Sequence, residues 1–358
     1  MMSFDGTRPI SKEHQFPVEN LLEWLSKNLE DYKADQKIDL VQFKGGQSNP
    51  TFLVQYGNRQ FVMRRKPPGK LLPSAHAIDR EYKVISALSK VNFPVAKPLG
   101  YCADIEVIGS EFYLMDYVQG RVFWDPRLPE LDNTSRLEIH REVNQVIATM
   151  HRLIPTEIGL GDYGKPSNYV SRQIDRWTKQ YRASETESIE AMNLLIDWLP
   201  QNIPQGDDTR LVHGDFRLDN MIIHPTEAKV LAVLDWELST LGHPLADFAY
   251  HVMVWRVQPE LFRGLQGASL KALNIPTEEE YVKLYFERTG FERIAQKDWD
   301  FYIIFNMFRL AAILQGVMAR ALQGNASSDQ AIDSGKRAKP LAAIAWKQVE
   351  QLIARGNS

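Results

Sequence analysis

The sequence is poor in several features that mark whole classes of protein. Its 358 residues include one cysteine, Cys102, which excludes an internal disulfide framework and a cysteine-rich metal cluster. We expect Cys102 to be a small buried apolar residue. Lysine and arginine number 42 and acidic residues 45, so the net charge is −3. No overall field therefore favours nucleic acid or an anionic membrane as a partner.

Long uninterrupted apolar runs are also missing. The most apolar stretch, residues 301–321, contains Asn306, Arg309 and Gln315, whereas a membrane span needs about 20 nearly uncharged residues. The stretch is predicted to be a buried helix. Residues 1–16 include acids and have no apolar centre, so they do not resemble a secretory signal. On these grounds we expect a soluble, cytoplasmic protein.

What is present is an ordinary globular composition, with 44% hydrophobic and 24% charged residues, in a chain long enough for two lobes. Apolar spacing after Pro17 predicts an amphipathic helix over 18–29. Short strand-like runs follow, with a helix over 77–88 inserted among them. They predict one hairpin from 52–56 and 60–64 and a second from 106–108 and 112–118.

After residue 120 the pattern becomes mainly helical. Ser135 with Glu138, and Thr277 with Glu280, have the spacing of capping boxes that begin helices. Three short strand-like runs interrupt the helices, at 210–212, 221–223 and 230–234. Together the two regions predict an α+β protein.

Polar residues gather around these three runs. Asp215 and Asn220 lie between the first two, and Asp235 follows the third. Strand ends that present oxygen atoms to one point suit a hard cation. Phosphoryl transfer needs a metal on the phosphates and a carboxylate that takes the proton of the acceptor hydroxyl. We therefore predict Asp215 as the catalytic base and Asn220 and Asp235 as Mg²⁺ ligands.

The motif His213-Gly214-Asp215 with Asn220, in the spacing H-x-D-x-x-x-x-N, and the following Leu234-Asp235-Trp236-Glu237 resemble the signature of a known family. This is the aminoglycoside phosphotransferase and choline-kinase-like branch of the protein-kinase-like fold, and the resemblance covers residues 40 to 320. It implies a bilobal fold, ATP and Mg²⁺ as cofactors, and transfer of phosphate to an alcohol group. The small N-lobe, residues 1–118, would hold a nucleotide-binding antiparallel sheet, and residues 119–358 a larger, mainly helical C-lobe.

Three neighbours of the motif are given supporting roles. His213 is predicted to bond the backbone of its own loop. Asp219 is predicted to be a surface or turn residue, because adjacent loop residues rarely point at the same ion. By resemblance, Asp247 braces the catalytic loop.

The N-lobe carries its own candidates for nucleotide binding. The segment 45–49 includes Ser48 and Asn49 and could fold over phosphates, although an ordinary turn has the same composition. Glu81 lies in the apolar stripe of the helix over 77–88 and needs a partner, for which Arg64 is the best candidate. The family usually has a lysine at this strand position, and arginine keeps the charge with a different geometry. Lys66 is the alternative phosphate contact, and a purely structural Arg64–Glu81 pair is another.

Residues 112–120 resemble the hinge between the lobes. The resemblance implies that Met115 borders the adenine and that backbone groups of Asp116 and Val118 bind its edge. An edge strand leading into a turn is the alternative.

Within the family, residues 63–69 and 74–82 look closest to kinase-like domains joined to, or encoded near, acyl-CoA dehydrogenases. This implies a hydroxy acid or hydroxyacyl-CoA as the acceptor. We expect the acceptor to be recognised by 156–206 and 256–276. Four cations in the first of these stretches, with Asp175 the single acid among them, favour an anionic or neutral acceptor, unless they form a solvated helix face: Arg172, Arg176, Lys179 and Arg182.

Three other functions stay open. The chain could be a nucleotide-binding pseudokinase or regulatory module, an aminoglycoside-type antibiotic kinase, or a protein kinase. The last is disfavoured because no activation segment follows Asp235. The oligomeric state and an acyl-CoA dehydrogenase partner cannot be inferred from these residues.

Overall fold

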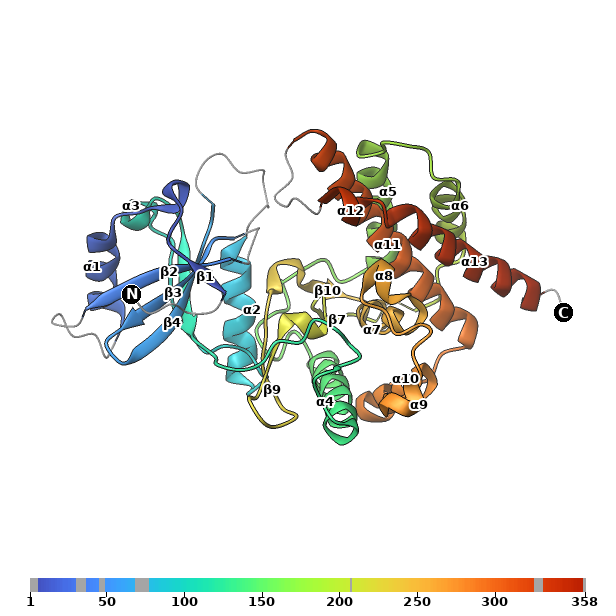
Figure 1. Cartoon of the computed structure of the whole chain (residues 1–358), viewed down its shortest axis with the longest axis horizontal. Coiled ribbons are helices and arrows are strands. Elements are labelled where there is room, and N and C mark those ends of the chain that lie inside the picture. The colour runs from blue at the N-terminus through green and yellow to red at the C-terminus, as the bar shows by residue number, and fades with distance from the viewer. Residues whose placement is uncertain are drawn as a thin grey trace. The chain divides into compact units, whose positions relative to one another are not determined.

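Two units make up the computed structural model of the chain (Figure 1). The structure describes residues 6–29, 37–44, 49–67, 77–206, 208–324 and 331–356. The first unit comprises residues 1–121, 222–225 and 231–237, and the second 122–221, 226–230 and 238–358. The sequence-based boundary after residue 118 stays a prediction.

The first unit is built on a six-stranded antiparallel sheet with the strand order β1-β2-β3-β4-β6-β5. Its strands are β1 (Thr7–Arg8), β2 (Ile38–Phe43), β3 (Thr51–Tyr56), β4 (Arg59–Arg65), β5 (Pro98–Cys102) and β6 (Phe112–Asp116), and its helices are α1 (Val18–Asn28), α2 (Ile78–Lys90) and α3 (Ile105–Ile108). The predicted hairpin of β3 and β4, the helix α1 after Pro17 and the burial of Cys102 are confirmed.

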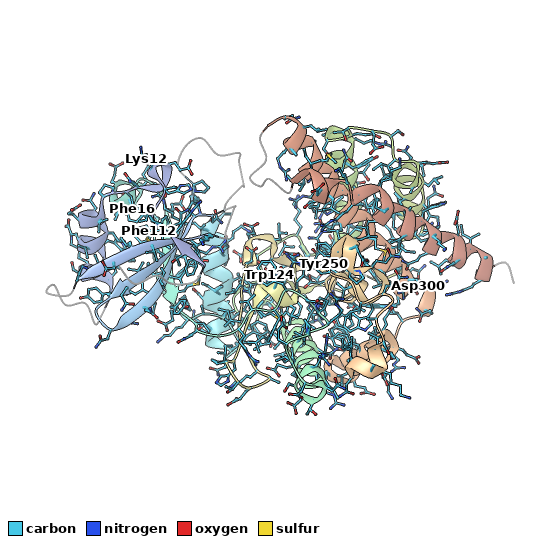
Figure 2. The ribbon with its side chains drawn as sticks, viewed as in Figure 1. Lys12, Phe16, Phe112, Trp124, Tyr250 and Asp300 are labelled. Carbon is cyan, nitrogen blue, oxygen red and sulfur yellow. The ribbon has the colours of Figure 1, made fainter. Side chains whose placement is uncertain are left out.

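Alternation along the strands assigns side chains to the two faces of this sheet. Phe112, which is labelled in Figure 2, belongs with Phe52 and Met63 to an apolar cluster that includes Leu21 and other residues of α1. The opposite face carries the side chains that reach α2, and Figure 1 shows α1 and α2 on opposite sides of the sheet. The strand period thus decides which residues of β4 and β6 can meet α2.

The second predicted hairpin is wrong. Residues 105–108 form the short helix α3, and β6 pairs with β5, a strand that the sequence pattern did not reveal. The Asp104 carboxylate accepts the Glu106 N–H at the start of α3, and Gly109 ends it with a φ of 81°. These are helix cap signals, and Gly109 had been interpreted as a hairpin turn.

The second unit is mainly helical. Its helices are α4 (Asn133–Arg152), α5 (Tyr169–Ala183), α6 (Glu190–Trp198), α7 (Pro244–Val252), α8 (Pro259–Phe262), α9 (Leu270–Leu273), α10 (Glu278–Thr289), α11 (Gln296–Leu322), α12 (Ala331–Gly335) and α13 (Ala338–Gly356). Its short strands β7 (Arg210–Val212) and β10 (Thr240–Gly242) pair. The strands β8 (Met221–Ile223) and β9 (Val230–Val233) also pair, and all but the first residue of each belong to the first unit. The three predicted runs are therefore β7, β8 and β9.

Helix α11 forms the centre of this unit and packs against α5, α7 and α13. By length and composition it could cross a membrane, but 83% of its most apolar window is buried inside the protein. The prediction of a buried helix over 301–321 is confirmed.

One of the two predicted capping boxes is present. Thr277 Oγ1 accepts the N–H of Glu280, and Thr277 N–H donates to the Glu280 carboxylate at 2.8 Å. Helix α4 instead begins before Ser135, because the carboxylate of Asp132 accepts the Ser135 N–H at 2.9 Å. Aspartate is as good an N-cap as serine, so the earlier cap sets the start of α4.

Candidate active site

The loop between β7 and β8 carries the predicted catalytic residues, and Asp247 of α7 holds its backbone. The Asp247 carboxylate accepts the N–H groups of His213 and Gly214, both at 2.8 Å. Burial alone would raise the pKa of Asp247, but bonds from His151 and the His213 backbone keep it low. Asp247 therefore stays ionised and braces the loop, as predicted from the resemblance.

Gly214 lets the loop turn sharply enough to present the next residue. Its φ is +81°, a conformation that L side chains rarely adopt. A Cβ at this position would lie 2.8 Å from the carbonyl oxygen of Leu238. Backbone conformation and space both require glycine here.

Two further side chains form hydrogen bonds with the backbone of the loop. The buried His213 accepts the Asp215 N–H on Nδ1 at 3.2 Å, which is the backbone role predicted for it. Arg309 of α11 donates to the carbonyl oxygen of Gly214, and its guanidinium lies 4.8 Å from the ring centroid of Tyr250. Arg309 was visible in the sequence as a charge inside an apolar stretch, but only as an argument against a membrane span.

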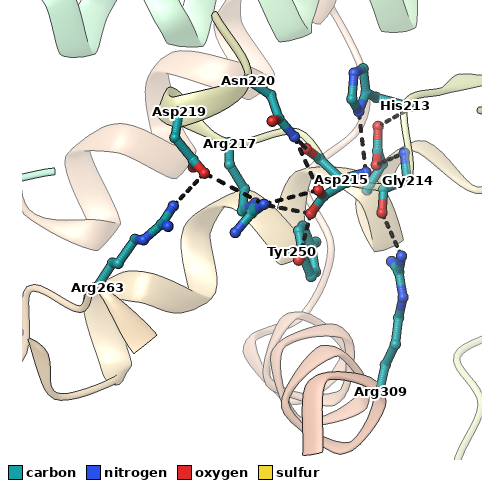
Figure 3. A network of polar contacts seen from close by, with 10 residues as sticks. His213, Gly214, Asp215, Arg217, Asp219, Asn220, Tyr250, Arg263 and Arg309 are labelled. Atoms are coloured by element: carbon teal, nitrogen blue, oxygen red, sulfur yellow. Dashed lines mark hydrogen bonds and ion pairs between the residues drawn. The ribbon is translucent and has the colours of Figure 1, made fainter. Parts of the chain in front are cut away.

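The Asp215 carboxylate is the centre of a polar network (Figure 3). Tyr250 Oη donates to its Oδ1 at 2.7 Å, and Asn220 Nδ2 donates to its Oδ2 at 3.0 Å. The guanidinium of Arg217 pairs with both carboxylate oxygens, with Nε 3.0 Å from Oδ1 and Nη2 3.1 Å from Oδ2. The structure thus brings the predicted base and one predicted metal ligand together, and adds Tyr250 and Arg217, which the sequence reasoning missed.

Electrostatics fix the protonation of these two added residues. Burial, and then the nearby Asp215 charge, raise the pKa of Tyr250, so it remains a hydrogen-bond donor. Burial disfavours the charge of Arg217, but Tyr250, Asp215 and Asp219 together raise its pKa, so it remains a cation.

Asp219 lies in the short 3₁₀ turn Leu218–Asn220, which agrees with the turn that was predicted, but its side chain is not on the surface. Its side chain is 7% exposed, lies 3.5 Å from Arg217 Nη2, and accepts a hydrogen bond from Arg263. The low exposure of Asp219 comes from its pairing with arginines. Two arginines, one of them 44 residues away along the chain, pair with this carboxylate, and no local pattern predicts them.

The first unit contains a second carboxylate centre, at Glu81 of α2. Arg64 Nε lies 3.0 Å from its Oε2, as predicted. Asn49 Nδ2 donates to Oε1 at 2.7 Å, and Tyr113 Oη donates to Oε2 at 2.9 Å. Arg64 and Tyr113 are direct register partners on β4 and β6, which explains why both reach the same carboxylate.

Arg64 also pairs with Asp235, whose Oδ1 lies 3.6 Å from Nη2. Asp235 has a φ of +64°, an uncommon conformation for a residue with a side chain. Lys66, the alternative to Arg64, instead donates to Glu111 at 2.6 Å. Arg64 is thus the cation that contacts both Glu81 and the predicted metal ligand of this unit.

The remaining predicted nucleotide contacts are distributed as follows. Met115 and Asp116 end β6, and the Asp116 N–H donates to the Lys97 carbonyl at 2.9 Å. Val118 follows the strand. Asn49 is turned toward Glu81, while Ser48 lies outside the described residues. The roles of all five residues in nucleotide binding stay predictions.

Residues 39–282 match the phosphotransferase enzyme family. The chain belongs to this family.

Relatives of this phosphotransferase include much longer proteins. Acyl-CoA dehydrogenase family member 10 of Mus musculus is 46% identical over 343 residues, which cover 95% of this chain and 32% of that protein. Acyl-CoA dehydrogenase family member 11 of Rattus norvegicus is 42% identical over 95% of this chain and 44% of its own length. The chain therefore spans less than half the length of these relatives.

Solved structures place the phosphotransferase in the predicted fold class. A Ralstonia eutropha protein provisionally assigned as an aminoglycoside phosphotransferase is 51% identical, with a TM-score of 0.86 over 94% of this chain and 99% of that one. Choline kinase from Cryptosporidium parvum has 14% identity and a TM-score of 0.63 over 95% and 97% of the two chains. The α+β protein-kinase-like fold and the resemblance to this family are confirmed.

The cations of α5 were predicted to favour an anionic or neutral acceptor unless they form a solvated helix face. Arg176, Lys179 and Arg182 are exposed, and Arg172 donates to the Lys165 carbonyl. This is the solvated-face alternative, so the charge of α5 does not identify an acceptor site. Guanidiniums beside the catalytic loop are the better candidates.

The oxygen atoms of the two predicted metal ligands show whether these residues suit a metal ion. Asn220 Nδ2 bonds both the carbonyl oxygen and the carboxylate of Asp215, so its amide oxygen points elsewhere. Asp235 is 38% exposed and offers carboxylate oxygen. Within the described parts of the chain, no three histidine, cysteine or acidic side chains cluster as a self-sufficient metal site. Amide and carboxylate oxygens of this kind suit a hard cation that takes its other ligands from phosphate and water.

Proposed function

We propose that this phosphotransferase is an ATP- and Mg²⁺-dependent kinase that transfers the γ-phosphate to a hydroxyl group of a small molecule. The arrangement around Asp215 carries the proposal: a partly exposed carboxylate on a braced loop, oriented by an asparagine whose oxygen remains available. Aminoglycoside phosphotransferase APH(4)-Ia, which shares the fold at 15% identity, was solved with ADP and hygromycin B. That complex supports a nucleotide as the phosphoryl donor.

In the proposed reaction, Asp215 accepts the proton of the acceptor hydroxyl while that oxygen forms a bond to the γ-phosphorus and the bond to ADP breaks. Tyr250 and Asn220 keep the carboxylate in one orientation. Asn220 and Asp235 would hold Mg²⁺, which supplies positive charge to the phosphates when bound. Arg64, which pairs with Glu81 and Asp235, is the cation of the first unit that we propose as a phosphate contact.

We propose a hydroxy acid or a hydroxyacyl compound, free or carried on CoA, as the acceptor class. The support is the similarity to acyl-CoA dehydrogenase family members, together with the guanidiniums of Arg217 and Arg263 beside the catalytic loop. An ATP-consumption assay with hydroxyacyl-CoAs, short hydroxy acids and kanamycin-like aminoglycosides tests this. Turnover is expected with the first two groups. Turnover with aminoglycosides alone would refute the acceptor class.

One observation favours a second candidate, a nucleotide-binding module without turnover. The cation at the strand position is arginine, and it is already paired with Glu81 and Asp235. ATP binding without phosphate transfer or hydrolysis under any condition would favour this candidate over the kinase.

A further inference from the structure

Beside the catalytic loop, four residues of the second unit form a connected arm: Trp124, Asp219, Phe262 and Arg263. Arg263 follows helix α8 with a φ of 44°, in the left-handed region that non-glycine residues rarely adopt. Its Nη1 donates to Asp219, and its guanidinium lies 4.5 Å from the ring centroid of Trp124. The Arg263 N–H donates to the Pro259 carbonyl as the C-cap of α8, while two side-chain contacts orient its guanidinium.

The side chains of the arm differ in their exposure to solvent. The Asp219 side chain is nearly buried, whereas Arg263 is 36% exposed and Trp124 is 62% exposed. A guanidinium has five N–H donors, and among the described residues one of them bonds Asp219. The arm thus presents an aromatic face and further donors to solvent. Figure 3 shows Arg263 pointing to Asp219, which Arg217 links to Asp215 of the catalytic loop.

The charges in this network disfavour a polycation as the acceptor. Arg217 lies between Asp215 and Asp219 and pairs with both, and Arg263 pairs with Asp219 on its other side. Each of these carboxylates already has a guanidinium partner. A polycation would have to displace an arginine to find an acid here, whereas an oxyanion meets unused N–H donors of Arg263.

We propose that Arg263, supported by Trp124 and positioned by Asp219, binds an oxyanion of the phosphoryl acceptor, either a carboxylate or a phosphate group. The planar guanidinium matches both groups in geometry and charge. The inference rests on the proposed function, and it names the residue that selects the acceptor. Phe262 connects the arm to the catalytic loop, because its ring centroid lies 5.5 Å from the guanidinium of Arg217.

Binding of matched probes tests this without requiring turnover. Four compounds are titrated by calorimetry into the protein, with and without Mg²⁺ and AMP-PNP: 4-hydroxybutyrate, glycerol 3-phosphate, neutral 1,4-butanediol and cationic 4-aminobutanol. At least one oxyanion should bind about tenfold tighter than the diol or the amine, the size of one charge-assisted contact. The carboxylate and phosphate probes distinguish the two kinds of oxyanion.

Substitution of the arginine gives the decisive comparison. Arg263→Gln should weaken oxyanion binding about tenfold and leave diol binding unchanged. Arg263→Lys keeps the charge and should recover part of the loss. Arg293→Gln, at an exposed arginine in another segment, is the matched control and should bind like the wild type. Melting temperatures of all variants exclude misfolding.

Two results would overturn the inference: no oxyanion preference in the wild type, or an undiminished preference in folded Arg263→Gln. Failure of the protein to bind Mg²⁺·AMP-PNP would instead refute the proposed function. The nucleotide-free titrations would still decide whether Arg263 selects oxyanions.

Discussion

The two units contain matching carboxylate centres. Glu81 and Asp215 each accept hydrogen bonds from a tyrosine hydroxyl and an asparagine amide, and each pairs with an arginine. In both units the arginine also reaches a second acid, so that it bridges two carboxylates: Glu81–Arg64–Asp235 in the first unit and Asp219–Arg217–Asp215 in the second.

Burial differs across each bridge in the same direction. The side chains of Glu81 and Asp219 are 2% and 7% exposed, whereas those of Asp235 and Asp215 are 38% and 17% exposed. In the first bridge the arginine is closer to the buried acid, at 3.0 Å from Glu81 and 3.6 Å from Asp235, whereas in the second it is closer to the exposed acid, at 3.0 Å from Asp215 and 3.5 Å from Asp219. By burial Asp219 corresponds to Glu81, whereas by its tyrosine and asparagine donors Asp215 does. The more exposed members are the predicted metal ligand and base.

Removing the buried acid of the first bridge should have the largest effect. Glu81→Gln leaves the nearly buried Arg64 with only the more distant Asp235, and should lower the free energy of unfolding by about 3 kcal/mol, as for other broken buried pairs. Urea denaturation measures this. Glu106→Gln, at an exposed glutamate of the same unit, should change stability little. An unchanged Glu81→Gln would mean that Asp235 alone holds Arg64.

Removing the exposed acid of the second bridge should change rate and not stability. Asp215→Asn should lower phosphoryl transfer about 10²-fold or more, the usual contribution of a general base. Arg217 keeps Asp219 as its partner, so the fold should persist. Initial rates and nucleotide titration separate these effects, with ATP affinity expected to stay close to that of the wild type. Full turnover by the variant would refute the assignment of the base.

The two centres also differ in whether they need a glycine with positive φ. Glu81 lies on a regular helix, whereas Asp215 follows a glycine with positive φ. Gly214→Ala combines that conformation with a contact at 2.8 Å and should cost about 2 kcal/mol of stability. Gly159→Ala is the matched control, with a φ of +76° and no atom within 4 Å, and should cost about 1 kcal/mol. Equal losses would show that space around Gly214 is unimportant.

Acid should lower the stability of the second unit through two buried histidines. Burial lowers the pKa of His251 to about 3 and that of His140 to about 4, from the ordinary value of 6.5. Below pH 6.5 the unfolded chain binds protons that the folded chain excludes, so the free energy of unfolding falls as pH falls toward 4. Each histidine contributes about 1.4 kcal/mol per pH unit.

His251→Gln removes one of these titrations. The stability of the variant should therefore decline less steeply than that of the wild type between pH 6.5 and 4, by about 1.4 kcal/mol per pH unit. Denaturation at a series of pH values measures the two slopes. Parallel curves would show that His251 does not contribute to the acid sensitivity.

Sequence reasoning succeeded where the signal is local or periodic. The hairpin of β3 and β4, the helix α1 and the burial of α11 follow from side-chain alternation and apolar spacing. The pairing of Glu81 with Arg64 was predictable because a carboxylate in an apolar helix stripe requires a cation, and β4 offers one on the correct face.

It failed where two signals compete or where partners are distant. Asp104 and Gly109 cap a short helix that had been interpreted as part of a hairpin, and Asp132 caps α4 ahead of Ser135. Tyr250, Arg309 and Arg263 reach the catalytic loop from helices or loops far along the chain. Their spacing relative to Asp215 carries no information about contact.

The sequence by itself determined the kind of chemistry, because the motif around Asp215, Asn220 and Asp235 supplies the oxygen atoms that phosphoryl transfer needs at a recognisable spacing. The tertiary structure decided which acids are buried and which are exposed. That distinction depends on long-range pairing with arginines and tyrosines, and it separates Asp219 from Asp215 although only three residues lie between them.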